Sequence, residues 1–595
     1  MRRAVVAVLA IQASLWAVTG PVATAQAAPT PVAGTGNPWG VNVVRFAPGT
    51  TPAAMNAAVR AASGTVTNDL SKIGALGVVS TNKSFATQIR ANRNVRGLWV
   101  DRVYSMTDPD TGPATAGGTA AAAIGGQGPQ SPPDPLHDAT SFNGETNPEG
   151  ILQWDDNRMN VPSAWTRSTG DHSVVVAVLD TGVDFTHKEL APNVDRGLVA
   201  NTIPCRFLAL VAGPALDSGD CAKLDNDGHG TWVASRIAGA VNGFGSNGIA
   251  PNVTVIGYKV LSTTIGGGLT SWIVDGMLRA CDAGADVMNM SIGGYDTTSP
   301  ADADDYFLWL DAVRYCRARG TAIFASAGNE HVRVNRANLT LTGATGRVEA
   351  LIGAGQVDAG NEGIASAIAG EPIEDFDARG LLEVPAGVPG VVMVSATNNA
   401  IGAAGADVPA NVRWPAPKTG ARDQLTYYSS YGSRIDITAP GGARKFNIPR
   451  SDGGPGDILF GGWGTVGALV AHGEICEDPA LGGPLTFSCF LLDHYAFGWL
   501  QGTSMSSPNA TGVAALALSS NHALQGRPDD LIARLKATAR TNMVNFMGPN
   551  DPLNTAPDYS GTPCTSGFCH VDFTHPISFA DAYGAGMVNA AAALG

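Results

Sequence analysis

The chain has 595 residues, which is too long for one ordinary hydrophobic core, so more than one folded unit is expected. Apolar residues make up 44% and charged residues 15%, a balance that excludes an intrinsically disordered chain and is typical of globular proteins. The formal net charge of −14 argues against nucleic acid or an anionic membrane surface as a partner.

The N-terminus has the features of an export signal. Arg2 and Arg3 supply a positive start, an almost uncharged apolar run follows at 4–18, and 25–27 offer a small-x-small cleavage site. The alternative is a membrane anchor, but the run is short for a span and a Pro/Ala/Thr-rich stretch follows it. We therefore predict a signal peptide at 1–27, a secreted, extracellular protein and no membrane-spanning segment.

Residues 40–105 have the pattern of a small α+β unit. β-rich runs and helical stretches follow in the order strand–helix–strand–strand–helix–strand, the order of a ferredoxin-like fold. Thr51 is a suitable N-cap and Gly64 a stop signal for the first helix. The strands are expected at 41–46, 65–70, 76–80 and 97–100, and the helices at 52–62 and 84–91.

Residues 107–149 are rich in Pro, Gly, Ala, Thr and Asp and have almost no large apolar side chains. Such a segment cannot bury enough surface to offset its chain entropy, so we interpret it as a linker. It separates the small N-terminal unit from the rest of the chain.

From residue 150 onward, apolar β-branched runs alternate with helical stretches. Continuous runs of this kind are typical of strands buried on both faces, and their alternation with helices indicates a doubly wound parallel α/β sheet. In such sheets the active site lies at the carboxyl ends of the strands. The runs lie at 174–179, 253–256, 287–290, 322–325 and 391–394, and helices are expected at 231–240, 272–283 and 306–319.

Eight cysteines all lie beyond residue 200, and an even number in an exported chain predicts four disulfides. Free thiols or a zinc site are the alternatives, but the chain has no Cys-x-x-Cys pair. Eight cysteines permit many connectivities. The spacing suggests Cys205–Cys221, Cys476–Cys489 and Cys564–Cys569, which leaves Cys281–Cys316.

Polar residues suited to acyl transfer stand at the ends of predicted elements. Asp180 ends a strand, whereas His229 and Ser504 each open a helix. Acyl transfer needs a nucleophile, a base and a carboxylate that orients the base. Asn329 follows another strand, and its amide could bind a developing oxyanion together with the Ser504 backbone N–H. Their motifs are DTG at 180–182, DGHGT at 227–231, ASAGN at 325–329 and GTSMS at 502–506.

These motifs, in this order, resemble those of the subtilisin family. Connecting segments at 248–251, 259–261, 289–294, 439–441 and 583–590 share the likeness, which extends from about 150 to 595. Insertions interrupt it at about 331–382, 442–499 and 541–578. The resemblance implies a serine endopeptidase with Asp180, His229 and Ser504 as its triad and Asn329 as an oxyanion donor.

The resemblance also implies a peptide-binding cleft, in which substrate joins the protein as an added β-strand. For the glycines of the set, a plain flexible loop is the alternative. Trp232 stands where the family usually has a second His, and we expect this to change packing without loss of the base. The implied substrate-binding residues are Gly266, Gly267, Gly268, Ser291, Ile292 and Gly293.

By the same resemblance, 28–106 would be a propeptide with its folded part at 40–105, and 150–595 the peptidase domain. The expected partners are protein or peptide substrates and the chain's own propeptide as inhibitor, with no nucleic acid and no membrane. A monomer is expected, with self-cleavage between about 104 and 134. The alternative is an N-terminal domain that has no inhibitory role.

No cofactor is expected for catalysis. The resemblance to the subtilisin family implies a structural calcium at Glu189 and the loop 242–247, where the alternative is a plain turn rich in Gly and Asn.

Two rival functions remain at this stage. A serine-carboxyl peptidase would use a Glu base and an oxyanion Asp, and His229 and Asn329 argue against it. A binding protein could keep the fold without turnover. The sequence predicts neither the preferred residue at the cleaved bond nor the biological substrate.

Overall fold

The computed structural model describes residues 40–105, 153–205, 219–359, 378–397, 423, 425–426 and 428–442, then 465–470, 472–473, 476–477, 489–492, 494–543, 555–556 and 575–595. The predicted signal peptide at 1–27, the linker at 107–149 and the pair Cys564–Cys569 lie outside these residues. Within the part described, no helix is both long and apolar enough to cross a bilayer.

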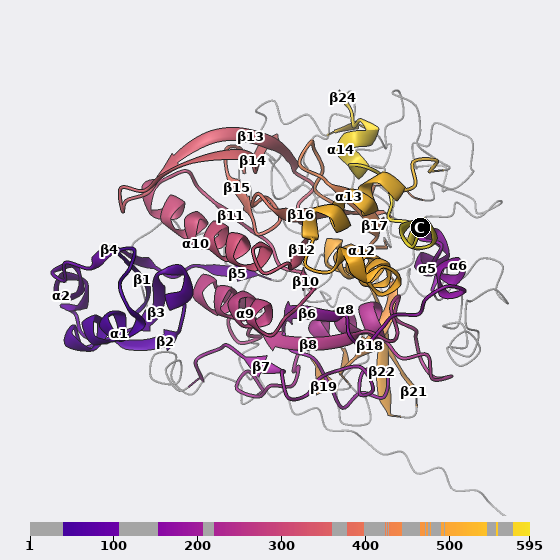
Figure 1. Ribbon diagram of the computed structural model, residues 1–595, viewed down its shortest axis with the longest axis horizontal. Coiled ribbons are helices and arrows are strands. Elements are labelled where there is room, and N and C mark those ends of the chain that lie inside the picture. Colours follow the sequence, from indigo (N-terminus) through magenta and orange to yellow (C-terminus); the bar gives the residue numbers. More distant parts are fainter. Residues whose placement is uncertain are drawn as a thin grey trace, which may run out of the picture.

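The N-terminal unit, residues 40–105, is an antiparallel sheet covered by two helices, in the element order expected from its sequence (Figure 1). Its strands are arranged in the order β2-β3-β1-β4. Met55, Val59 and Phe85 of the helices pack against Val44 and Val78 of the sheet. The elements are β1 (Val41–Phe46), α1 (Pro52–Ala61), β2 (Thr65–Asn68), η1 (Ser71–Ile73), β3 (Ala75–Val79), α2 (Phe85–Arg90), β4 (Val95–Val100) and β5 (Val103–Ser105).

The centre of the molecule is a 7-stranded parallel sheet with the order β17-β16-β12-β10-β6-β8-β7. Alternate side chains of β6 enter different cores: Ala177 and Leu179 one, Val176 and Val178 the other. This confirms the prediction of a doubly wound sheet. The strands are β6 (Val175–Asp180), β7 (Ala200–Asn201), β8 (Thr254–Lys259), β10 (Val287–Met290), β12 (Ala322–Ser326), β16 (Val391–Thr397) and β17 (Ile437–Pro440).

Helices cover both faces of this sheet (Figure 1). Side chains of α9 and α10 share one core, and those of α8 and α12 share the other. These four are α8 (His229–Ala238), α9 (Thr270–Asp282), α10 (Pro300–Arg317) and α12 (Thr503–Ser520). The remaining helices are α5 (Trp154–Arg158), α6 (Val161–Trp165), η4 (His522–Leu524), α13 (Pro528–Thr538), α14 (Phe579–Tyr583) and α15 (Ala590–Ala593).

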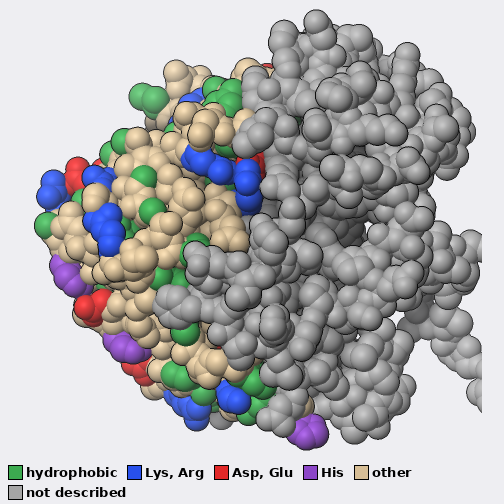
Figure 2. Space-filling view, turned by 90° about the vertical axis from the view of Figure 1, so that its right-hand side faces the viewer, with side chains coloured by type: hydrophobic (Ala, Val, Ile, Leu, Met, Phe, Trp, Pro, Cys, Tyr) green, Lys and Arg blue, Asp and Glu red, His purple; other side chains and the backbone are tan. Residues whose placement is uncertain are grey.

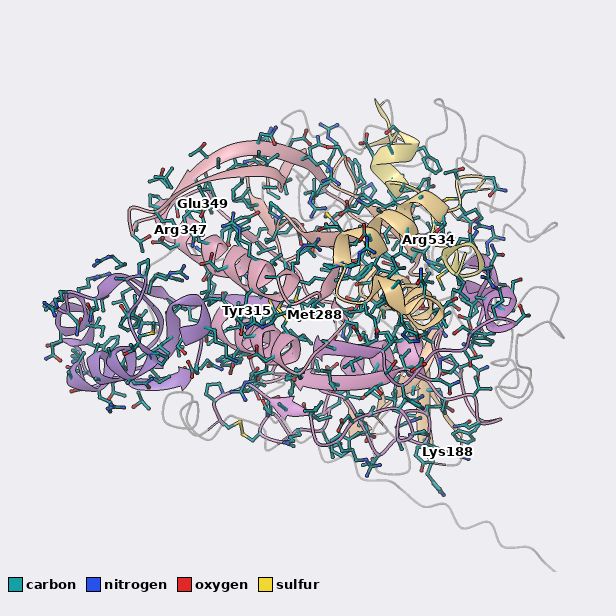
Figure 3. The ribbon with its side chains drawn as sticks, viewed as in Figure 1. Lys188, Met288, Tyr315, Arg347, Glu349 and Arg534 are labelled. Atoms are coloured by element: carbon teal, nitrogen blue, oxygen red, sulfur yellow. A yellow bond between two sulfur atoms is a disulfide. The ribbon has the colours of Figure 1, made fainter. Side chains whose placement is uncertain are left out.

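The first insertion forms a long hairpin, β13 (Arg333–Thr342) and β14 (Val348–Ala359). It belongs to an antiparallel sheet with β15 (Leu382–Val384) and β11 (Gly294–Asp296). Figure 3 shows Arg347 and Glu349 on this hairpin, where they form an ion pair of 2.7 Å. Arg347 also pairs with Asp311 of α10, which fastens the hairpin to a helix that covers the central sheet.

The second insertion packs against α8. Its sheet consists of β18 (Thr465–Leu469), β21 (Cys489–Leu492) and β22 (Tyr495–Leu500). Trp232 Nε1 donates to the Gly498 carbonyl at 3.0 Å, and a Cβ on Gly467 would lie 2.8 Å from that same nitrogen. The inserted sheet thus occupies the space above Trp232. The remaining short strands are β19 (His472–Gly473), β20 (Cys476–Glu477), β23 (Thr555–Ala556) and β24 (His575–Pro576).

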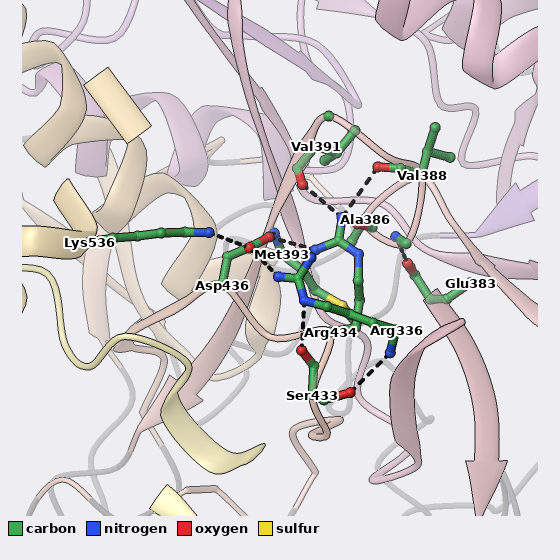
Figure 4. A network of polar contacts seen from close by, with 12 residues as sticks. Arg336, Glu383, Ala386, Val388, Val391, Met393, Ser433, Arg434, Asp436 and Lys536 are labelled. Carbon is green, nitrogen blue, oxygen red and sulfur yellow. Dashed lines mark hydrogen bonds and ion pairs between the residues drawn. The ribbon is translucent and has the colours of Figure 1, made fainter. Parts of the chain in front are cut away.

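A buried arginine joins the end of the sheet to its surroundings (Figure 4). Arg434 donates to the carbonyls of Ala386 and Val391 at 2.7 and 2.8 Å and pairs with Asp436 at 2.5 Å. Lys536 of α13 reaches the same carboxylate at 2.6 Å. Burial alone would raise the pKa of Asp436, but these cations hold that pKa well below its ordinary value.

Two predicted disulfides are present among the described residues, and Figure 3 draws them in yellow. Cys205–Cys221 and Cys281–Cys316 have Cα–Cα distances of 5.6 and 5.3 Å, within the usual range for a disulfide. The pairs Cys476–Cys489 and Cys564–Cys569 involve side chains outside the described residues and stay predictions.

The surface mixes charges of both signs. On the described part of the face in Figure 2, Lys and Arg side chains lie among Asp, Glu and His rather than in one continuous basic area.

Candidate active site

An aspartate and a histidine meet at the carboxyl edge of the sheet. Asp180 is the last residue of β6 and His229 the first of α8, and Nδ1 of His229 lies 2.7 Å from Oδ1 of Asp180. The two side chains are only 0% and 1% exposed. Because Nδ1 faces a buried carboxylate, it carries the proton in the neutral ring, and Nε2 is the nitrogen able to accept one.

Glycine allows this close approach. A Cβ on Gly230 would lie 2.0 Å from the Gly182 carbonyl oxygen and 3.0 Å from Cβ of Asp180. Any side chain there would push α8 away from the end of β6. Gly228, just before His229, has φ +116°, a left-handed conformation that glycine adopts without strain.

Asp225 organises the turn that carries His229. Its carboxylate accepts hydrogen bonds from the backbone N–H groups of Asp227, Gly228 and Thr231 at 2.9–3.1 Å, and from Thr231 Oγ1 at 2.7 Å. Asp225 was not among the residues predicted for the site. The sequence does contain a sign of its role, because an aspartate just ahead of a predicted helix start is typical of a capping residue.

Asp227 serves the same turn. It accepts from the His229 backbone N–H at 2.9 Å, and burial, followed by repulsion from Asp225, raises its pKa to about 7. Its contact is with the histidine's backbone, so Asp227 supports the turn.

Asn329 is linked to Ser504 through Thr503, the residue that precedes the serine. Ser504 is the second residue of α12, and Asn329 follows β12. Oδ1 of Asn329 accepts from the Thr503 N–H at 2.8 Å and from Thr503 Oγ1 at 2.9 Å. The amide oxygen is thereby turned toward the start of α12, and the NH₂ end points away from Thr503. Ser504 stands at a helix N-terminus, where backbone N–H groups lack intrahelical partners.

Of the predicted substrate residues, the glycine run forms a short strand, β9 (Gly267–Leu269), after a left-handed turn at Gly266 with φ +63°. β9 pairs antiparallel with β5 of the N-terminal unit, which places Tyr104 opposite Gly268 and Ser105 opposite Gly267. A Cβ on Gly268 would lie 2.2 Å from the Val260 carbonyl oxygen. An extended chain thus already lies along this edge.

The other predicted substrate segment, 291–293, follows β10. The Ser291 hydroxyl donates to the Ser504 carbonyl at 2.8 Å, so this side chain supports the start of α12. Ile292 is fully buried, and its carbonyl accepts from the Ser326 hydroxyl at 3.4 Å. Gly293 leads directly into β11.

The side chain of Glu189 is suited to be one ligand of a hard cation. It is fully buried, neither carboxylate oxygen has a hydrogen-bond partner among the described residues, and burial raises its pKa to about 9. A Cβ on Gly245 would lie 2.4 Å from its Oε1, so the loop 242–247 passes directly beside it. The described residues contain no group of three or more His, Cys, Asp and Glu suited to a metal. Most ligands would therefore be backbone or amide oxygens, which Ca²⁺ accepts.

Comparison with known proteins agrees with this geometry. The subtilase family profile matches residues 171–555. Subtilisin DY of Bacillus licheniformis is 29% identical over 202 residues, which are 34% of this chain and 63% of that protein. Subtilisin NAT of Bacillus subtilis subsp. natto is 28% identical over 372 residues, which are 62% of this chain and 61% of that protein. Less than two thirds of either relative is matched.

Among solved structures, the epidermin leader peptide processing serine protease of Staphylococcus aureus superposes with a TM-score of 0.56 at 16% identity. The superposition covers 93% of this chain and 97% of that one. At this identity the likeness concerns the fold. With a family profile matched over more than half of its length, the chain belongs to the subtilase family.

Proposed function

We propose that this protein is a secreted serine endopeptidase that hydrolyses peptide bonds in proteins through an acyl-enzyme. The observation that carries the proposal is the buried Asp180–His229 pair, 2.7 Å apart, at the sheet edge where the helix of Ser504 begins. This is the arrangement that makes a serine hydroxyl nucleophilic.

In the proposed reaction, Ser504 Oγ attacks the carbonyl carbon of the substrate while His229 Nε2 takes the hydroxyl proton. The negative charge that develops on the carbonyl oxygen is bound by the Asn329 amide N–H and the Ser504 backbone N–H. The buried Asp180 carboxylate stabilises the imidazolium and holds its orientation.

The C–N bond then breaks, and His229 delivers its proton to the leaving amine. Water attacks the remaining ester with His229 as base, which releases the new carboxylate and restores Ser504.

We further propose that 28–106 are a propeptide that inhibits the enzyme and is removed by it, with a linker at 107–149 and the peptidase domain at 150–595. The pairing of β5 with β9 supports this, since it occupies the strand expected to bind substrate. The chain continues beyond Ser105 into the segment where the cut is predicted.

Export is proposed from the signal-like residues 1–27. The disulfides Cys205–Cys221 and Cys281–Cys316 support it, because such bonds persist in oxidising compartments. A monomer remains the expectation, and Glu189 with oxygens of the loop 242–247 would hold a structural Ca²⁺.

The test uses the full-length wild-type chain and its Ser504→Ala variant, each treated with a fluorophosphonate serine probe and with a diverse peptide mixture. Wild type should be labelled once, at Ser504, and should cleave peptides. The variant should do neither and should accumulate with residues 40–105 attached. Unlabelled wild type that cleaves no peptide would favour a binding protein. Maturation of the purified variant alone at the wild-type rate would contradict both the nucleophile and the self-processing.

A further inference from the structure

The side chain of Tyr104 fills a pocket of the catalytic unit beside β9. It is 3% exposed, and its ring packs edge-on against Trp309 of α10, with centroids 5.3 Å apart and planes at 88°. A Cβ on Gly294 would lie 2.5 Å from a Tyr104 ring carbon. The absence of a side chain at Gly294 therefore makes room for an aromatic ring.

Two buried carboxylates form the end of this pocket. The Tyr104 hydroxyl lies 2.8 Å from Oδ1 of Asp296 on β11 and 2.9 Å from Oδ2 of Asp305 on α10. Both carboxyl groups belong to fully buried residues. Asp305 also accepts from Thr270 Oγ1 and from Trp99 Nε1, each at 3.0 Å. The end of the pocket is thus built for a hydrogen-bond donor, not for a hydrocarbon.

A cation lies at the mouth of the same pocket. Arg102, two residues before Tyr104 and hence on the same side of the extended chain, places Nη1 3.1 Å from Oδ1 of Asp296 and also pairs with Asp302. Its side chain is 31% exposed. Arg102 and Tyr104, separated by one residue, therefore contact the same carboxylate, that of Asp296.

The direction of β5 relates this pocket to the proposed site of cleavage. Gly267, opposite Ser105, forms a β-bridge with Ser262. Thr263, which follows Ser262, accepts a hydrogen bond at 3.0 Å from Nδ2 of Asn226. Asn226 lies three residues before His229. The chain from 103 to 105 therefore runs toward the histidine turn. Arg102 and Tyr104 lie on the amino-terminal side of the bond that would be cleaved.

Removal of residues 40–105 would leave the pocket without most of its donors. The departing donors are Tyr104, Arg102 and Trp99. The hydroxyl of Thr270 belongs to the part that stays, and it would still donate to Asp305. Any strand that covers the pocket again would bury both acids, and a buried carboxyl group without hydrogen-bond donors is costly, so a ligand that restores the donors is favoured. A substrate strand on β9 would bring its side chains to the same positions.

We propose that Asp296 and Asp305 make this pocket a specificity site for protein substrates with a tyrosine, preceded two residues earlier by an arginine or lysine, on the amino-terminal side of the cleaved bond. The inference rests on the proposed endopeptidase activity and adds its substrate class. Phenylalanine fills the same ring space but gives neither carboxyl group the hydroxyl donor that tyrosine supplies. A site built to bind a hydroxyl discriminates more strongly than an apolar pocket that loses a methyl group.

The test uses quenched fluorescent peptides that span residues 98–113 of this chain, in four versions: native, Arg102→Ala, Tyr104→Phe and both changes together. The enzyme is the active form prepared from the full-length chain, with active sites counted by the fluorophosphonate probe. Mass spectrometry locates the cleaved bond. The Tyr104→Phe peptide should show a kcat/KM about ten- to a hundredfold lower, as expected when buried acceptors lose their hydrogen-bond donor. The Arg102→Ala peptide should be a few-fold poorer, because that contact is partly exposed.

An Asp296→Asn enzyme should show a smaller preference for arginine over alanine and a smaller preference for tyrosine over phenylalanine. The matched control is Asp529→Asn, the same change at a carboxylate that is 92% exposed on α13, which should keep the wild-type ratios. Ratios within one enzyme do not depend on how much of it is folded.

Equal cleavage of the tyrosine and phenylalanine peptides by labelled wild-type enzyme would overturn this inference and leave the proposed function intact. An unlabelled enzyme that cleaves no peptide would overturn the proposed function itself. The wild-type comparison alone decides, even if Asp296→Asn does not fold.

Discussion

Replacing Gly230 by alanine should separate His229 from Asp180. The new Cβ would lie 2.0 Å from the Gly182 carbonyl oxygen, whereas ordinary contact begins at 3.4 Å, so α8 must move by about 1.4 Å. A misplacement of about 1 Å can lower a catalytic rate about a hundredfold. We therefore expect kcat to fall at least about a hundredfold, with KM little changed because β9 is untouched.

The assay is steady-state kinetics per labelled active site, together with NMR of the downfield proton on His229 Nδ1. Gly197→Ala is the matched control, because its new Cβ would meet only Asp195 Oδ1, at 3.2 Å and on a side chain that can move. Gly230→Ala with activity within threefold of wild type and an unchanged Nδ1 proton signal would refute the reasoning. It would mean that the close contact does not hold the pair together.

Three further predictions follow from the site and its surroundings. Asn329→Ala should lower kcat about 10²–10³-fold with little change in KM, a loss of the size known when subtilisin itself loses this donor, and a loss confined to KM would contradict the assigned role. Burial raises the pKa of Asp101 from 3.8 to about 7 in the assembled chain, although hydrogen bonds from Ser271 lower it in part, so inhibition by an added 40–105 segment should be strongest below pH 4 and weaken as pH rises toward 7. Inhibition constants measured across that range should lose much of their slope in Asp101→Asn. Chelation of divalent ions should lower the Tm of the wild type but not of Glu189→Ala, and a wild-type Tm indifferent to chelator would remove the calcium proposal.

The sheet could be predicted because its strands are buried on both faces. The run 174–179 nearly coincides with β6, Val175–Asp180, since a continuous β-branched segment has few other uses. Helix starts were less accurate. The helix expected at 306–319 begins at Pro300, because Ser299 caps it by accepting from the Asp302 N–H at 3.4 Å. Several acidic residues in its first turns obscured the apolar pattern.

Asp180, His229, Ser504 and Asn329 share one property: each stands at or near an end of a regular element. That position is visible in the sequence, so Asp180, His229 and Asn329 could be placed at one sheet edge before their contacts were known. Contacts between distant segments could not be predicted. Trp232 meets a carbonyl 266 residues away, and the end of the Tyr104 pocket combines acids from β11 and α10. No local pattern marks such a meeting.

The acids of that pocket connect two properties of the proposed enzyme. While residues 40–105 are in place, Tyr104 and Arg102 supply donors to the buried Asp296, and departure of the N-terminal unit would break these contacts. The energy that makes the pocket selective for a tyrosine hydroxyl would therefore also retain the N-terminal unit after cleavage. A change that weakens this selectivity, such as Asp296→Asn, should for the same reason speed release of residues 40–105. Specificity and latency would then have one physical origin in this chain, because a substrate and the N-terminal unit present the same donors to the same two acids.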